Sequence, residues 1–127
     1  MKRAGMFLLM VVFAALVLGC QRSPAKDLYE SYVELEQIMT HYSSEPEKLI
    51  PALDAYIETN RDLWCHTKFL EKEWSQERID KDFSMWEHRL TAVMGRIVDL
   101  DLLIQDNLLN NPEQLNAYEE RIRRIDC

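Results

Sequence analysis

Apolar residues recur along the chain at alternating steps of four and three positions, and the longest such row runs from residue 79 to residue 104. Its eight members are Ile79, Phe83, Trp86, Leu90, Val93, Ile97, Leu100 and Ile104. This heptad spacing puts all eight side chains on one stripe of a single long helix. Because an apolar stripe of that length must be covered, we expect the rest of the domain to form helices that pack against it.

Two helices are predicted ahead of this row. Ser23 followed by proline is typical of a helix start, and an apolar row then predicts a helix over residues 24–42. Ser44 opens the capping-box sequence Ser-Glu-Pro-Glu, which predicts the start of a second helix. The apolar pattern extends this helix over residues 46–74.

Two further helices complete the predicted fold. The long apolar row falls in a helix over residues 76–109, and Asn111 before a proline predicts a last helix over residues 112–126. Short connections favour antiparallel neighbours, so the predicted fold is all-α, an up-down four-helix bundle over residues 24–127. Because the two middle helices are the longer ones, we expect their shared end around residue 75 to project as a bare hairpin.

The first residues differ in character from the rest of the chain. Lys2 and Arg3 precede an unbroken apolar run of 13 residues. This run is shorter than the roughly 20 residues that span a bilayer and is typical of a secretory signal. Two aliphatic residues, a small residue and a cysteine end it: Val17, Leu18, Gly19 and Cys20. The segment resembles the signal peptide and lipobox of bacterial lipoproteins.

The resemblance implies a defined processing. Residues 1–19 would be removed as a signal peptide, and the Cys20 thiol would carry a diacylglyceryl group, often with a further acyl chain on its amine. Residues 20–23 would form a lipidated tether, and two or three acyl chains anchor a protein stably. Gln21 resembles the signal for the outer membrane of a Gram-negative cell, facing the periplasm. The alternatives are an ordinary cleaved signal and an uncleaved anchor.

The charge of the chain excludes some partners. The formal net charge is −7, and residues 1–19 hold two bases and no acid, so the remainder carries −9. Such an acidic domain is a poor ligand for nucleic acid and is repelled by anionic headgroups, apart from a covalent anchor. We therefore expect no nucleic-acid partner. The lipoprotein resemblance implies a membrane contact through the acyl chains, and we expect a protein partner in the cell envelope if the domain is an interaction module.

Two cysteines remain once Cys20 is assigned to lipid. An exported protein meets an oxidising compartment, where paired thiols form disulfides. Cys65 lies 19 residues into its predicted helix and Cys127 lies 15 residues into the last one. If these helices descend from the same end, the two thiols differ in height by roughly 6 Å, within reach of a bridge after small shifts. We predict a Cys65–Cys127 disulfide; the alternative is two free thiols.

The sequence contains no pattern that indicates a catalytic or metal centre. His41, His66 and His88 lack helical metal-ligand spacing. The chain has no Glu-x-x-His pair, zinc-protease motif, glycine-rich phosphate loop or nucleophile elbow. We therefore predict no catalytic residue, no metal ligand and no cofactor, and a protein that is not an enzyme. The many acidic residues indicate a solvated face.

Aromatic residues gather near the expected hairpin, where Phe69, Trp74 and Trp86 either complete the core or form an interaction surface. Two functions follow. A protein-interaction module would have an exposed apolar patch near Trp74 and a filled core. A bundle that binds a small ligand or lipid would have an internal pocket of about 300 Å³ or more. The residues do not favour a third class, a lysozyme-type inhibitor, and the continuous apolar rows favour the interaction module.

The lipobox resemblance makes a direct prediction. The substitution Cys20→Ala removes the only thiol to which the lipid can be attached at this site, so it is expected to abolish acylation and processing. Mass spectrometry of the protein from its native envelope measures both. A Cys20→Ala protein that still matures normally would refute the lipobox assignment.

Overall fold

The computed structural model describes residues 22–127, so the predicted signal peptide and Cys20 lie outside the described residues. The described chain is all-helical, as predicted. It forms four α-helices and one 3₁₀ turn: α2 (Pro24–His41), α3 (Pro46–Lys68), η1 (Leu70–Lys72), α4 (Gln76–Asn107) and α5 (Pro112–Arg123). Helices α2, α4 and α5 end slightly before their predicted ends.

Side-chain caps fix the start of three of these helices. Each cap accepts a hydrogen bond from a backbone N–H in the first turn, which satisfies one of the donors that a helix start leaves unpaired. The three caps and their donors are Ser23 with Lys26, Ser75 with Arg78, and Asn111 with Gln114. The predicted caps at Ser23 and Asn111 are thus confirmed.

Helix α3 begins at Pro46 as predicted, but its cap and its end differ from the prediction. Ser44 is not its cap, because the N-cap position is Glu45, which forms an ion pair with Lys48 at 3.1 Å. The α-helix also ends at Lys68, well before the predicted end at residue 74. The chain tightens there into the 3₁₀ turn η1, which keeps Leu70 buried while the chain turns back towards α4.

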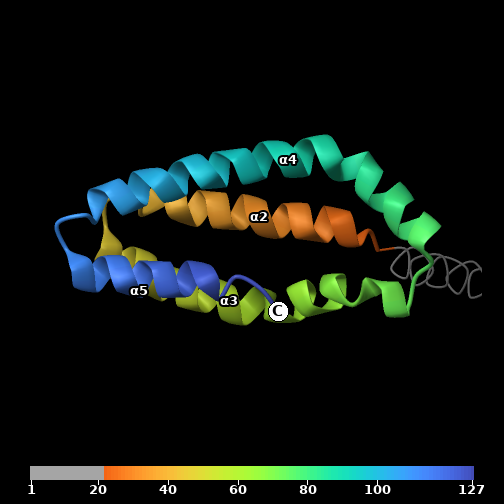
Figure 1. The fold of residues 1–127 in the computed structure, drawn as a ribbon, viewed down its shortest axis with the longest axis horizontal. Helices are drawn as coiled ribbons and strands as arrows, with labels where there is room; N and C mark the ends of the chain where they lie inside the picture. Colours follow the sequence, from red (N-terminus) through yellow and green to blue (C-terminus); the bar gives the residue numbers. More distant parts are fainter. Residues whose placement is uncertain (1–21) are drawn as a thin grey trace, which may run out of the picture.

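Helices α2 and α4 lie side by side and run in the same direction (Figure 1). Two contacts set this register. Near the start of both helices, the Ser23 hydroxyl donates to the Asp82 carboxylate at 2.6 Å. Further along, the guanidinium of Arg96 donates two hydrogen bonds to the Glu36 carboxylate, at 2.7 and 3.2 Å.

Helices α3 and α5 form the second parallel pair. The Arg121 guanidinium donates to the Asp54 carboxylate at 3.0 Å. Beyond the end of α5, Cys65 and Cys127 are joined by a disulfide with their Cα atoms 4.7 Å apart, as the sequence predicts. The bridge forms because α3 and α5 begin at the same end of the molecule, and a short C-terminal tail reaches back to α3 (Figure 1).

The order of neighbours differs from a simple up-down bundle, in which each helix packs beside the next one in sequence. Within residues 22–127, the closest α-helix pairs are α2 with α4, α2 with α3, and α3 with α5. Helix α2 therefore lies between α3 and α4. At the end shared by α3 and α4, Leu70 is buried and Trp74 is partly buried, whereas residues 75–78 are exposed; α2 begins further along, beside Asp82.

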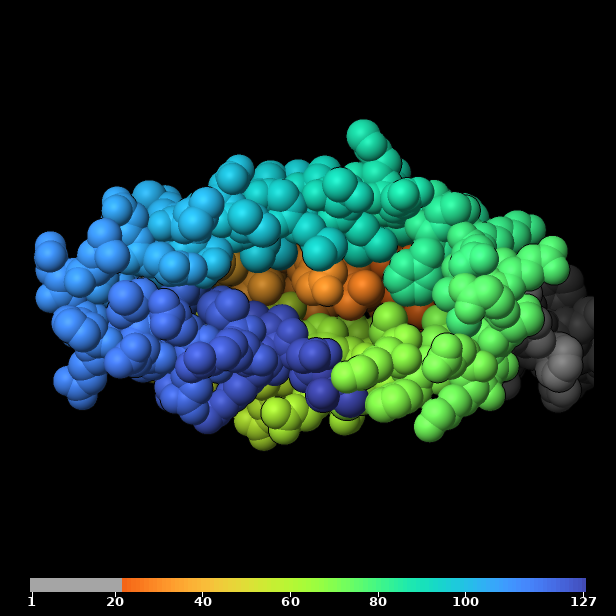
Figure 2. All heavy atoms as spheres, in the orientation of Figure 1, coloured from red at the N-terminus to blue at the C-terminus, as the bar shows by residue number. Residues whose placement is uncertain are grey.

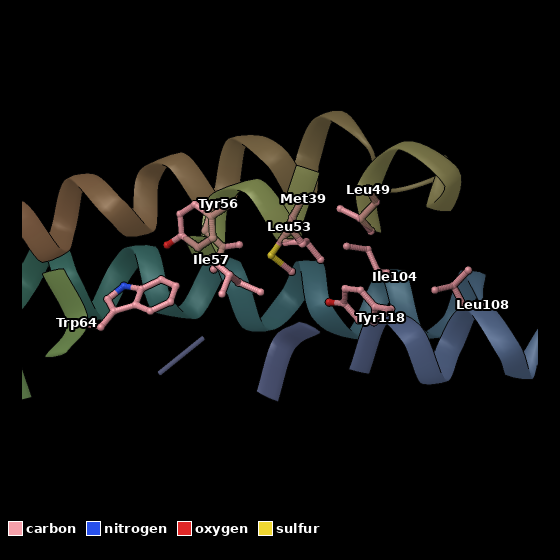
Figure 3. Packing of buried hydrophobic residues seen from close by; sticks show 10 residues of the cluster. Met39, Leu49, Leu53, Tyr56, Ile57, Trp64, Ile104, Leu108 and Tyr118 are labelled. Carbon is pink, nitrogen blue, oxygen red and sulfur yellow. The ribbon is translucent and has the colours of Figure 1, made fainter. Parts of the chain in front are cut away.

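The long apolar row of α4 faces this core. Leu90, Val93 and Ile104 are buried, and the other five members of the row are partly buried. Burial of such an aliphatic side chain contributes about 1.5–3 kcal/mol. All four helices contribute to one cluster, which extends from Trp64 at one end to Leu108 at the other (Figure 3).

Two buried tyrosines form hydrogen bonds between helices through their phenol groups. The Tyr56 hydroxyl donates to the Ser31 carbonyl of α2 at 2.9 Å. The Tyr118 hydroxyl of α5 donates to the Asp101 carboxylate of α4 at 2.6 Å. Burial raises the pKa of both phenols, and for Tyr118 the hydrogen bond to Asp101 raises the pKa further. Both groups therefore stay neutral donors at ordinary pH.

The disulfide makes a testable contribution to stability. Cys127→Ser opens a cross-link between residues 62 positions apart. The loop-entropy relation gives a loss of about 4 kcal/mol in the free energy of unfolding. Denaturant titration of the oxidised protein and the variant measures it. Reductant should lower the stability of the unsubstituted protein to that of Cys127→Ser and leave the variant unchanged; equal stabilities without reductant would contradict the prediction.

Candidate interaction surface

Trp86 does not stand free at a bare hairpin. Its ring packs against the ring of Tyr29 in α2, with the centroids 5.5 Å apart. The Arg89 guanidinium lies over the same ring at 4.8 Å from its centroid. The expectation of a projecting hairpin is therefore wrong at this position, because α2 runs alongside α4 and covers the indole.

Basic side chains also lie over the aromatic rings of Phe69 and Trp74. The Lys72 ammonium sits 4.7 Å from the centroid of Phe69, whose side chain is 44% exposed. The Arg78 guanidinium stacks on the partly buried Trp74 ring at 3.5 Å. Such cation–π pairs are favourable where the ring meets water. The structure thus presents these residues as aromatic–basic pairs and not as one continuous apolar patch.

A more apolar surface lies on the C-terminal half of α4. Three large side chains there are exposed by half or more: Met94 by 50%, Val98 by 56% and Leu102 by 60%. The exposed Gly95 lies between Met94 and Val98, and the exposed Thr91 lies one turn before Gly95. These residues share one side of α4, next to the side that faces the core. We call the surface of Thr91, Met94, Gly95, Val98 and Leu102 the outer face.

Gly95 makes the outer face locally flat. An added Cβ at this position would meet no atom of the described residues within 4 Å. Glycine inside a helix costs roughly 0.5–1 kcal/mol relative to alanine. Packing within residues 22–127 therefore does not require the glycine. Small residues on a helix let a second helix approach its backbone closely.

Acidic side chains border the outer face. Glu87 precedes it by one turn, and Asp99 and Asp106 follow one edge; all three are exposed. Asp101 borders the other edge and already accepts hydrogen bonds from Tyr118 and Gln105. The outer face is thus an apolar strip with a negative rim.

A cavity of about 250 Å³ opens beside the outer face, between α2, α4 and α5. Its lining is almost entirely apolar: Tyr32, Leu35, Met39, Met94, Ile97, Val98, Asp101, Ile122 and Ile125. Figure 2 shows α2 at the bottom of the groove between α4 and α5. Met94 and Val98 belong to both surfaces, so the groove and the outer face are continuous.

The described residues offer few other kinds of site. Among residues 22–127, no group of three or more His, Cys, Asp or Glu side chains converges as metal ligands would. None of the helices in this range is long and apolar enough to cross a membrane.

Comparison with known protein families, curated proteins and solved structures finds no match to the chain.

The outer face was not predicted from the sequence, although a signal for it exists. Thr91, Gly95, Val98 and Leu102 follow one another at steps of four, three and four, which is a second heptad row on the same helix. Only two of its members are large and apolar. The pattern is therefore weaker than the apolar row that includes Val93 on the same helix. Two adjacent rows on one helix indicate packing on two sides.

Gly95 supplies a test of whether the outer face is free within the domain. Gly95→Ala adds a methyl group in open space and improves helix propensity, so we expect the free energy of unfolding to rise by about 1 kcal/mol. Denaturant titration measures the change. A decrease in stability would show that another part of the protein packs on Gly95.

Proposed function

We propose that this protein is a lipid-anchored interaction module of the bacterial cell envelope, whose outer face on α4 binds an amphipathic helix of another envelope protein. The exposed row of Met94, Val98 and Leu102 carries the proposal. Exposed apolar surface arranged as a stripe is typical of a protein contact. The open position at Gly95 gives a partner helix room to approach.

The rim of the outer face favours one kind of partner. Glu87, Asp99 and Asp106 are exposed beside the apolar strip. A helix with an apolar row flanked by Lys or Arg complements this arrangement, since opposite charges at the edge of an interface steer association and fix register. A partner helix with an acidic flank is disfavoured for the same reason.

The anchor and the outer face occupy different parts of the molecule. The lipobox resemblance places the membrane anchor just ahead of α2, whose start is hydrogen-bonded to Asp82 of α4. Position 98 lies 16 residues beyond Asp82 along α4, roughly 24 Å away at 1.5 Å per residue. The proposed tether therefore holds the domain at one end, away from the outer face.

The cavity beside the outer face favours a second candidate, a carrier of a small apolar ligand. Its volume of about 250 Å³ is slightly below the roughly 300 Å³ at which small-molecule sites begin. Its apolar lining suits part of an acyl chain. Native mass spectrometry of protein isolated from the envelope separates the two functions, because a carrier retains its ligand.

Photo-crosslinking in the envelope tests the interaction module. A photoreactive residue at position 98 or 102 is expected to capture one protein, and the same residue at position 103 is the matched control. Leu103 is also exposed, by 48%, but points about a third of a turn away from the outer face. The captured segment should be a helix with basic residues beside its apolar row.

Two substitutions sharpen this test. Val98→Asp leaves stability within about 0.5 kcal/mol, because the side chain is exposed, but should abolish capture at position 102. Asp99→Lys should weaken capture, and an acidic residue in the identified partner should restore it. Capture that is equal at positions 98 and 103, or confined to position 74 or 86, would refute the outer face as the binding surface.

A further inference from the structure

A hollow of about 220 Å³ lies where the chain enters α2. The start of α2, the turn before α4 and the first turns of α4 enclose it, at the end of the molecule seen at the right of Figure 1. Seven residues line it: Arg22, Ser23, Trp74, Arg78, Lys81, Asp82 and Met85. We call it the tether-end hollow.

The tether-end hollow is positive within an acidic protein. Asp82 is its one carboxylate, and both of its oxygens are occupied, by the Ser23 hydroxyl at 2.6 Å and the Ala25 backbone N–H at 2.9 Å. Among the ion pairs of residues 22–127, none involves Arg22, Arg78 or Lys81. Three basic side chains therefore line the hollow without an acidic partner.

Among the neighbouring acids of α4, Glu77 is exposed one turn before Lys81, whereas Asp80 and Glu87 face another way. Asp80 and Glu87 line a different hollow, with Phe83 and Leu90, and Asp80 accepts a hydrogen bond from Gln76. The basic residues instead share a side of α4 that is centred on Met85, which is 74% exposed. Basic groups around an exposed apolar side chain suit a phosphate group at the surface of a bilayer.

The position of the hollow in the chain supplies the second argument. Arg22 is two residues after Cys20, so their Cα atoms are at most about 7 Å apart. If Cys20 carries a diacylglyceryl group, its glycerol lies at the depth of the lipid headgroups, and the hollow lies there too. Indole rings favour this interface, and Trp74 is beside the hollow with Arg78 stacked on it at 3.5 Å.

We propose that the tether-end hollow docks the domain on the membrane by binding the phosphate of an anionic phospholipid headgroup. Arg22, Arg78 and Lys81 contact the phosphate, while Trp74 and Met85 lie in the interface. The inference rests on the lipid anchor of the proposed function. Docking fixes the orientation of the domain on the bilayer, which an acyl anchor alone does not.

Fluorescence quenching of Trp74 tests the docking. The acylated mature protein is placed in phosphatidylcholine vesicles with or without phosphatidylglycerol, each with a nitroxide quencher at the headgroup, and Trp74→Phe gives the signal due to Trp74. We expect strong quenching of Trp74 in the anionic vesicles. In the variant Arg78→Glu/Lys81→Glu, the ratio of docked to undocked protein should fall about fivefold for each basic charge lost.

Arg61→Glu/Arg123→Glu is the matched control, because it makes the same charge change at two exposed residues outside the hollow and should keep the quenching. If the double variant in the hollow does not fold, Lys81→Gln at an exposed position takes its place. Unquenched Trp74 in the unsubstituted protein, or equal quenching in the hollow variant, overturns the docking.

Mass spectrometry of the same sample separates this inference from the anchor. Acylated protein with unquenched Trp74 refutes the docking and leaves the anchor standing. Protein without acyl chains refutes the anchor, and the quenching of Trp74 in anionic vesicles still decides whether the hollow binds headgroups.

Discussion

The packing of the apolar row of α4 on α2 is the contact on which the other features depend. Helix α2 lies between α3 and α4, so it carries the core contacts of both. Because α2 and α4 run in parallel, α2 begins beside Asp82, six residues into α4, and the Asp82 carboxylate accepts hydrogen bonds from the Ser23 hydroxyl and the backbone N–H of Ala25. This register forms the tether-end hollow, and further along α4 the side turned away from the core carries the exposed outer face.

Helix α4 contributes residues to three different parts of the structure. One side fills the core through residues such as Val93, a second carries the outer face, and its first turns supply Arg78 and Lys81 to the tether-end hollow. The helix has 32 residues and is therefore about 48 Å long. That length is enough to keep a proposed membrane contact and a proposed partner contact apart on one rigid element.

Local signals in the sequence predicted the helices well. The heptad row of α4, the caps at Ser23 and Asn111, and the Cys65–Cys127 pairing all follow from spacing and capping chemistry. Ser44 was misleading because its capping-box pattern competes with Glu45, which forms an ion pair with Lys48 instead. Periodicity also cannot say where α3 gives way to a 3₁₀ turn, since the burial of Leu70 there depends on the tertiary fold.

The order of neighbours and the surfaces were less predictable. Each apolar row says that a helix is covered but does not say by which helix, so α4 on α2 could not be derived from spacing. The outer face was hard to predict because two members of its heptad row, Thr91 and Gly95, are not large apolar residues. The tether-end hollow joins residues about 60 positions apart in sequence, such as Ser23 and Asp82, and only the parallel register brings them together.

The two hydrogen bonds that Asp82 accepts at the start of α2 have a mechanical consequence. A pull on the chain ahead of Ser23 does not act on the first turn of α2 alone, because two hydrogen bonds pass the force to α4. Since α2 lies between α3 and α4, its withdrawal requires both of its apolar contacts to slide at the same time. Packed helices that must slide together yield under a larger load than a helix that unwinds turn by turn, so the domain is built to resist tension from the side on which its chain enters.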